Sequence, residues 1–339
     1  MSKKDVFNGL IERAKQYSGK TICFPEGEEK RVVEAIEMVV KNNLCKVITF
    51  ASNDVKEKLY SKKALEQITI IDASLETEQS KELANALYEL RKEKGLTQEM
   101  AESLIKQPMY YSCMLLKQGL ADGIVAGAVL HSADVMRPAF QIIKQKKNIL
   151  KASSCFLMEM PEGSSLGENG FMIFADCAVV QYPTAEELAG IALASRDSAK
   201  ALCGINPRIA MLSYSTNASK TDDEVLLRIK KAVELFKEQD SETIIEGEIQ
   251  ADASILPEVA QRKSPNGVLG GKANVLIFPD INAGNIGYKL VQHFTKTRAV
   301  GPIIQGLNKP VNDLSRGATS EEIYLTTAVT LLQTAEIKG

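Results

Sequence analysis

The 339-residue sequence has no tryptophan and only two histidines, His131 and His293, which lie far apart in the chain. It also has no C-x-x-C pair, so a structural zinc site is poorly supported, and two histidines offer few options for a Ser/His/Asp triad. Neither a G-x-x-x-x-G-K-[ST] phosphate loop nor a G-x-G-x-x-G dinucleotide fingerprint occurs. These absences argue against a zinc protein, a P-loop nucleotide hydrolase and an enzyme built on a dinucleotide fingerprint.

An excess of charge of one sign is lacking too. The chain carries 41 Lys and Arg against 43 Asp and Glu, a net charge of −2, which provides no basic surface for nucleic acid or for an anionic membrane. No stretch approaches the roughly 20 apolar residues of a membrane span, and the opening segment, MSKKDVFNGLIERAKQYSGK, has no apolar core of a secretory signal. We therefore expect a cytoplasmic protein.

The six cysteines are scattered along the chain, mostly in or beside apolar segments. This distribution predicts buried structural thiols rather than metal ligands or a nucleophile. The cysteines are Cys23, Cys45, Cys113, Cys155, Cys177 and Cys203.

Strand-like and helix-like segments alternate along the chain, which predicts α/β architecture with largely parallel sheets. The length exceeds what one core usually accommodates, so we expect two domains, with junctions near residues 150 and 300. Strands are expected at 21–24, 46–50, 68–71 and 123–129, and a helical stretch at 97–118 should break near Pro108. Two strands around a Gly-rich turn, 152–159 and 170–179, instead predict an antiparallel hairpin. A helix from 184 should start with a capping box of Thr184 and Glu187.

The most informative motif lies near the end of the chain, in GPIIQGLNKPVNDLSRG at 301–317. A short apolar strand at 302–304 leads into a polar turn, and Ser315 and Arg316 come just before a helical segment at 320–334. A helix N-terminus favours anions, Arg offers a planar charged fork, and Ser offers a hydroxyl. Together they predict a site for a small phosphorylated substrate. The alternative is that Ser315 is a helix N-cap and Arg316 a surface charge.

Two further segments follow or contain predicted strands. In GAVLHSADVMRP, at 127–138, Ser132 or Asp134 could cap the next helix, and Arg137 lies about one turn into it. In EGEIQADA, at 246–253, the acidic residues could bind a metal, but their alternation fits a strand whose polar face is partly exposed. These features predict a two-domain α/β enzyme that handles a phosphorylated small molecule with arginines, without a metal or a redox cofactor.

Five blocks of the sequence resemble the phosphate acetyltransferase (phosphotransacetylase) family, also called phosphate acetyl/butyryltransferases. The resemblance implies two three-layer α/β domains, as in isocitrate and isopropylmalate dehydrogenases, with the active site in the cleft between them. It also implies a homodimer, and a C-terminal segment that returns to the first domain, giving domains 1–150 plus 300–339 and 151–299. The blocks lie at 24–35 (FPEGEEKRVVEA), 121–144, 246–254, 278–292 (FPDINAGNIGYKLVQ) and 301–317.

The resemblance also implies a set of site residues. Glu322 corresponds to the family's proposed base, where the family usually has Asp, and Ala318 stands where it often has Cys. Glu322 could instead complement the dipole of the helix that begins beside it. Catalytic roles fall on Ser315, Arg316 and Glu322, and substrate or phosphate binding on Arg137, Arg91, Asn312 and Ser132.

The reaction implied by the resemblance exchanges an acetyl group between coenzyme A and phosphate. The substrates would be acetyl phosphate, coenzyme A and phosphate, with no tightly bound cofactor, no metal, and no residues yet assigned to coenzyme A. We expect direct attack of the thiolate in a ternary complex, because the cysteines suggest no acyl-enzyme. The alternatives are a phosphate butyryltransferase and a non-catalytic acetyl-CoA-sensing domain; a dehydrogenase of the related fold lacks an evident carboxylate cluster for its metal.

Overall fold

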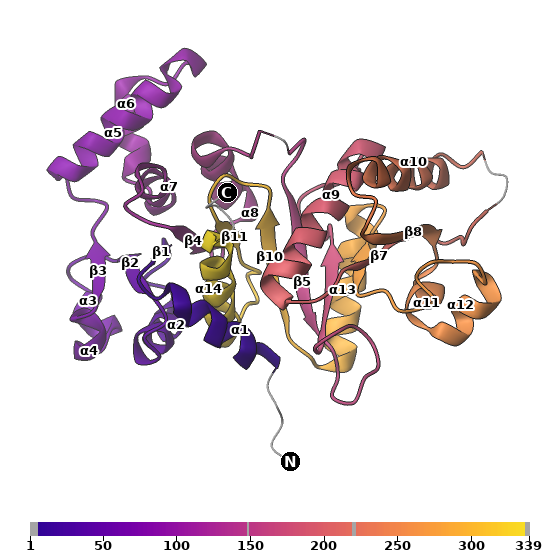
Figure 1. Cartoon of the computed structure of the whole chain (residues 1–339). Coiled ribbons are helices and arrows are strands. Elements are labelled where there is room, and N and C mark those ends of the chain that lie inside the picture. Colours follow the sequence, from indigo (N-terminus) through magenta and orange to yellow (C-terminus); the bar gives the residue numbers. More distant parts are fainter. Residues whose placement is uncertain (1–5, 148, 219–221, 336–339) are drawn as a thin grey trace. The chain divides into compact units, whose positions relative to one another are not determined.

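The computed structural model describes residues 6–147, 149–218 and 222–335. The chain divides into two compact units (Figure 1): the first comprises residues 7–145 and 307–335, and the second comprises Val6 and residues 146–306. This division differs from the expected one at Val6 and at residues 146–150, which group with the second unit, and at residues 300–306. Strand β10 (Ala299–Gln305) pairs antiparallel with β5 (Ser153–Glu159), so these residues complete the sheet of the second unit before the chain returns to the first.

The first unit is built on a five-stranded sheet with the order β11-β4-β1-β2-β3, in which every pair is parallel. The first three strands have the expected bounds, and β4 ends at Ala126, earlier than expected. The strands are β1 (Thr21–Phe24), β2 (Lys46–Phe50), β3 (Ile68–Ile71), β4 (Gly123–Ala126) and β11 (Val311–Asp313).

Nine helices are described in or beside this unit. The expected break near Pro108 is confirmed, because α6 ends at Ile105 and α7 begins at Pro108. Proline is tolerated at the first position of a helix because the N–H there has no partner within the helix. Helix α14 is buried along most of its length and packs against α2, β4 and β11. The helices are α1 (Val6–Ala14), α2 (Lys30–Lys41), α3 (Lys56–Leu59), α4 (Lys62–Leu65), α5 (Glu78–Arg91), α6 (Gln98–Ile105), α7 (Pro108–Gln118), α8 (Ser132–Pro138) and α14 (Ser320–Ala335).

Strand β11 was not expected from the sequence, which predicts a polar turn there. Val311, Asn312 and Asp313 pair with Ile124, Val125 and Ala126 of β4, and all three are buried. Asn and Asp have low strand propensity, so a three-residue strand that contains both cannot be recognised from its sequence. Its pairing with β4 brings the chain segment that carries Ser315 to the end of β4.

The second unit contains a six-stranded sheet with the order β10-β5-β6-β9-β7-β8. The expected hairpin of β5 and β6 is confirmed as an antiparallel pair, and the β6–β9–β7–β8 part is parallel. The capping box of Thr184 and Glu187 is also confirmed. With two mostly parallel sheets and helices between the strands, the α/β fold class is confirmed. The other elements are β6 (Phe171–Ala175), β7 (Arg208–Leu212), β8 (Ile244–Ile249), β9 (Val275–Ile277), α9 (Ala185–Ser198), α10 (Glu224–Gln239), α11 (Ala251–Ile255), α12 (Pro257–Lys263) and α13 (Ile281–Thr295).

The acidic strand of this unit corrects one expectation. Glu246 and Glu248 were expected on a partly exposed face of β8, but they are only 8% and 0% exposed. The Glu246 carboxylate accepts hydrogen bonds from the hydroxyl of Ser264, at 2.6 Å, and from the N–H of Leu269, at 3.0 Å. Glu246 therefore ties the loop after α12 to β8.

Five of the six cysteines are buried, and Cys45 is half-buried. Burial raises the pKa of the Cys23 and Cys45 thiols to about 12. The expectation of buried structural thiols is therefore confirmed for five of them. Across the described ranges, no helix is both long and apolar enough to cross a membrane.

Candidate active site

All seven predicted site residues belong to the first unit. Ser132 follows β4, and Ser315 and Arg316 follow β11, so both segments leave the carboxyl edge of neighbouring parallel strands. The strand order places β4 and β11 on one side of β1 and places β2 and β3 on the other. Ligands of open α/β sheets bind at the carboxyl edge near such a reversal.

Ser315 and Arg316 lie on an exposed loop between β11 and α14. The Ser315 hydroxyl accepts a hydrogen bond from the N–H of Gly317 at 3.3 Å, and the Ser315 carbonyl accepts one from the N–H of Ala318 at 2.8 Å. Helix α14 starts only at Ser320, and Thr319 precedes it. The alternative that Ser315 caps this helix is therefore wrong, and its side chain faces the surface of the loop.

Glu322 lies in the first turn of α14 and forms a capping box with Thr319. Its carboxylate accepts hydrogen bonds from the N–H of Thr319, at 2.8 Å, and from the Thr319 hydroxyl, at 3.2 Å. The same hydroxyl accepts from the N–H of Glu322 at 3.2 Å. A capping box accounts for an acidic residue at this position without any catalytic role.

Arg91 and Arg137 come from different helices and meet around Tyr110. Arg91, at the end of α5, donates to the carbonyl of Gln141 at 3.2 Å, and the Tyr110 hydroxyl donates to the side-chain oxygen of Gln141 at 3.1 Å. Burial raises the pKa of Tyr110, and the positive charges of Arg137 and Arg91 oppose that rise. The Arg137 side chain is 60% exposed, and its nearest carboxylate partner, Asp134, lies 3.8 Å away. Both charges therefore act on the Tyr110 hydroxyl, and most of the Arg137 side chain remains open to an anion.

Ser132 is the first residue of α8, and neither it nor Asp134 caps that helix as expected. The N-cap position is held by His131, without a side-chain cap. The Ser132 hydroxyl instead lowers the pKa of Asp313 at the end of β11. Ser132 therefore lies close enough to the segment after β11 to influence its charge.

Asn312 is fully buried, and its amide faces α14 rather than the exposed loop. It donates to the hydroxyl of Thr330 at 2.8 Å and to the side-chain oxygen of Gln333 at 2.7 Å. With both amide hydrogens engaged, Asn312 holds β11 against α14 and thereby supports the Ser315 loop from behind.

Asp313 was not predicted, although it stands within the 301–317 motif. Its side chain is buried, and within the described ranges its Oδ1 atom has no hydrogen-bond partner. Burial raises the pKa of Asp313 to about 6. Ser132 and the Leu314 N–H lower this pKa, whereas the negative charge of Glu26 raises it further. Asp313 therefore destabilises the fold when it is ionised.

We expect Asp313→Asn to stabilise the protein above pH 6. The raised pKa means that the contribution of Asp313 to stability is fully present below about pH 4 and is lost as pH rises through about 6. The asparagine should therefore raise the free energy of unfolding by about 2 kcal/mol near pH 8, with a difference that vanishes near pH 4. Urea unfolding across this range measures it, and a difference independent of pH would contradict the assignment.

Gly127, at the start of the turn after β4, allows the two site segments to approach each other. Its φ of +107° lies in the left-handed region. A Cβ at this position would overlap the Oδ1 atom of Asp313 and lie 2.7 Å from the backbone nitrogen of Leu314. Any other residue would therefore push the β4 and β11 segments apart.

We expect Gly127→Ala to reduce the free energy of unfolding by about 2–4 kcal/mol, since backbone strain and overpacking add. Gly119→Ala is the matched control, because Gly119 also has a positive φ, +79°, but a Cβ there meets no atom within 4 Å. The control should cost only about 1–2 kcal/mol. Equal losses in the two variants, measured by urea unfolding, would show that the contact with Asp313 has no effect.

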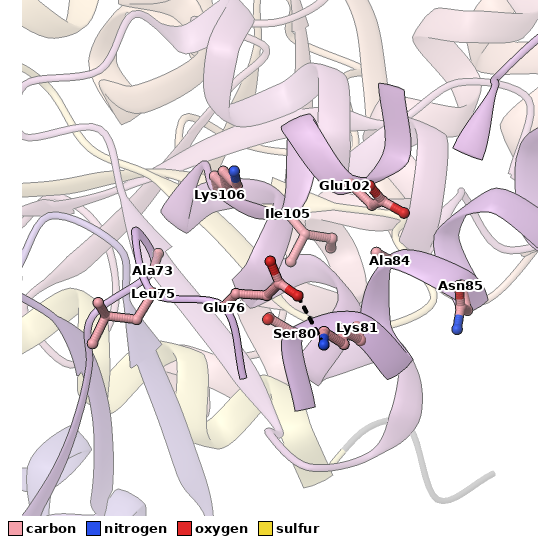
Figure 2. A pocket seen from close by; sticks show the side chains of 10 residues that line it. All are labelled: Ala73, Leu75, Glu76, Ser80, Lys81, Ala84, Asn85, Glu102, Ile105 and Lys106. Atoms are coloured by element: carbon pink, nitrogen blue, oxygen red, sulfur yellow. Dashed lines mark ion pairs between the residues drawn. The ribbon is translucent and has the colours of Figure 1, made fainter. Parts of the chain in front are cut away.

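Among the cavities of the first unit, one reaches the turn after β4 and a second lies next to it. The larger, about 580 Å³, lies at the carboxyl ends of β1, β2 and β3 and reaches Val129 and Leu130 of the turn after β4. The smaller, about 250 Å³, lies between the segment after β3 and helices α5 and α6. Figure 2 shows its Glu76–Lys81 ion pair, 2.8 Å long, facing residues of α6. Ala73 and Lys106 line both cavities.

Comparisons with known proteins match nearly the whole chain to members of a single family. A family model described as phosphate acetyl/butaryl transferase matches residues 5–331. The phosphate acetyltransferase of Thermoanaerobacterium thermosaccharolyticum is 44% identical over 328 residues, which cover 97% of this chain and 99% of that protein. The phosphate acetyltransferase of Acetivibrio thermocellus is 45% identical over 330 residues, covering 97% and 98%. Among solved structures, a phosphotransacetylase from Streptococcus pyogenes is 38% identical, with a TM-score of 0.89 and coverage of 99% of this chain and 100% of that chain.

Proposed function

This chain belongs to the phosphate acetyl/butyryltransferase family, and we propose that it exchanges an acetyl group between acetyl phosphate and coenzyme A. The observation that carries this proposal is the similarity, over nearly the full length of both chains, to relatives named phosphate acetyltransferase. The exposed Ser315–Arg316 loop and the exposed side chain of Arg137, which belong to the same unit as Arg91, support it.

The reaction requires a thiolate and a stabilised leaving group. A thiol has a pKa of about 8.5, so a base or a positive field must remove its proton near neutral pH. The thiolate sulfur attacks the acetyl carbon, the new C–S bond forms, and the bond between that carbon and the bridging oxygen breaks as phosphate leaves. Negative charge therefore grows on the carbonyl oxygen and on the departing phosphate, where fixed arginines can stabilise it.

The proposed roles follow the family resemblance residue by residue. Arg137, Arg91 and Ser132, which is the first residue of α8, bind the phosphate. Arg316 binds the phosphate or the carbonyl oxygen, and the Ser315 hydroxyl donates to that oxygen or contacts the thiol. Glu322 takes the thiol proton, in addition to its capping contact with Thr319.

Attack is direct, and coenzyme A is a substrate rather than a bound cofactor. Burial raises the pKa of Cys113 and Cys177 far above the usual range, and that of Cys23 and Cys45 to about 12. Thiols of this kind are poor nucleophiles at neutral pH, which disfavours an acyl-enzyme. The homodimer and the cytoplasmic location stay predictions.

Thioester formation from acetyl phosphate and coenzyme A tests this function, with butyryl phosphate as the competing donor. We expect kcat/KM to favour acetyl phosphate by at least about 10-fold, since a pocket shaped for the smaller group must exclude extra methylenes. A preference for butyryl phosphate would assign the chain to the butyryl branch of the family. Absence of turnover with both donors would point to a non-catalytic acetyl-CoA-sensing role.

A further inference from the structure

The segment Pro25–Arg31, which runs from the end of β1 into the first turn of α2, has no role in the reaction described above, yet it contacts both site loops. Glu26 is half-buried and faces the turn after β4. Its Oε2 atom accepts hydrogen bonds from the N–H groups of Gly127 (2.7 Å) and Ala128 (2.9 Å). Its Oε1 atom accepts from those of Val129 and Leu130, both at 2.7 Å. One carboxylate thus fixes four consecutive residues that lead into α8.

Arg31, in the first turn of α2, holds the same turn and the Ser315–Arg316 loop together. One terminal nitrogen donates to the carbonyls of Arg316 (2.8 Å) and Ala318 (2.9 Å). The other donates to the carbonyl of Ala128, at 2.9 Å. The Nε atom donates to the carboxylate of Glu29 at 2.6 Å, which sets the plane of the guanidinium. A planar fork can serve three carbonyls on two loops, which the single ammonium of a lysine cannot do in the same geometry.

We infer that Glu26 and Arg31 are positioning residues that clamp the turn 127–130 to the loop 315–318 and thereby set the distance between Ser132 and Arg316. This inference rests on the proposed function for its kinetic consequences but not for its structural ones. Neither side chain needs to touch a substrate, because the terminal nitrogens of Arg31 and the acceptors of Glu26 are directed at backbone groups.

The kinetic test uses Arg31→Ala, Arg31→Lys and the neighbouring control Lys30→Ala, whose side chain is 89% exposed. Displacing a contributing group by about 1 Å can cost up to about 100-fold, so we expect Arg31→Ala to lower kcat at least about 10-fold with KM changed less than about 3-fold. Added guanidinium should restore part of kcat in this variant. Methylammonium, which has the charge without the fork, should restore less, and Arg31→Lys should stay impaired. Lys30→Ala should behave as the parent.

Hydrogen exchange of the same proteins tests the clamp without relying on turnover. In Glu26→Gln, half of the acceptor capacity becomes an NH2 group that opposes backbone N–H donors. Exchange at residues 127–130 should therefore accelerate about tenfold or more, while peptides from β7 and β9 in the second unit stay unchanged. Glu34→Gln on the exposed side of α2 is the matched control.

The outcomes separate this inference from the proposed function. Faster exchange at 127–130 in an enzyme without thioester-forming activity would keep the clamp and overturn the function. Parent-like exchange in Glu26→Gln, or parent-like kcat in Arg31→Ala, would overturn the clamp. So would a loss of kcat in Arg31→Ala that only follows the loss of folded protein, measured by thermal unfolding, and that guanidinium leaves unchanged.

Discussion

Replacing Arg316 or Arg137 with alanine is expected to lower kcat/KM for acetyl phosphate at least about 100-fold in each variant. Each guanidinium is proposed to contact charge that grows on the phosphate or the carbonyl oxygen during acyl transfer. Loss of a comparable donor to a developing oxyanion costs about 2.7–4 kcal/mol. Because both side chains are largely exposed in the unit and take no part in its core, the fold should survive either substitution.

A lysine variant refines this experiment. Arg316→Lys keeps the charge and removes the planar fork, so partial activity there would show that charge matters more than a two-point contact. Arg13→Ala, on α1, is the matched control, since that helix contributes no proposed site residue. A parent-like kcat/KM in Arg316→Ala or Arg137→Ala, with the protein folded by circular dichroism, would remove that residue from the site.

Replacing Glu322 with glutamine is expected to lower kcat near neutral pH about 100-fold, the usual effect of losing a general base. Glutamine can replace glutamate in a capping box, so the contact with Thr319 should persist. The substitution therefore removes the proton acceptor while it preserves the start of α14. The pH dependence of kcat should also lose its acidic limb.

Two companion variants decide between the base and the cap. Glu322→Asp keeps a carboxylate, and an Asp variant at least as active as the parent beside a crippled Gln variant would support the base. Glu321→Gln, in the same helical turn, should leave kcat unchanged. If Glu322→Gln turns over like the parent, then Glu322 is a capping residue only, and the field of Arg316 and its neighbours activates the thiol.

Local patterns in the sequence were sufficient for most elements of the fold. The strands at 21–24, 46–50 and 68–71 have the expected bounds, because short apolar segments between turns have few alternatives. Proline at 108 and the Thr184–Glu187 pair act within one helical turn, so their effects can be predicted without tertiary structure. The Ser315–Arg316 motif could likewise be recognised from the sequence, because its residues are adjacent in the chain.

Other features depend on partners that are distant in the sequence. Val311–Asp313 becomes a strand only because β4 offers a free edge, and Glu246 and Glu248 are buried because loops cover their strand. Arg31 reaches a carbonyl 285 residues away.

The sequence by itself therefore determined the α/β class, the family and most strand and helix positions, since these depend on spacing and residue type within short windows. The tertiary structure alone decided which polar side chains pair within the protein and which remain open to a substrate. Asn312 is committed to α14, Glu26 and Arg31 to the two site loops, whereas Arg137 remains largely exposed. The physical reason is that a polar side chain pairs with whatever group the fold brings within about 3 Å, and that group is set by long-range packing.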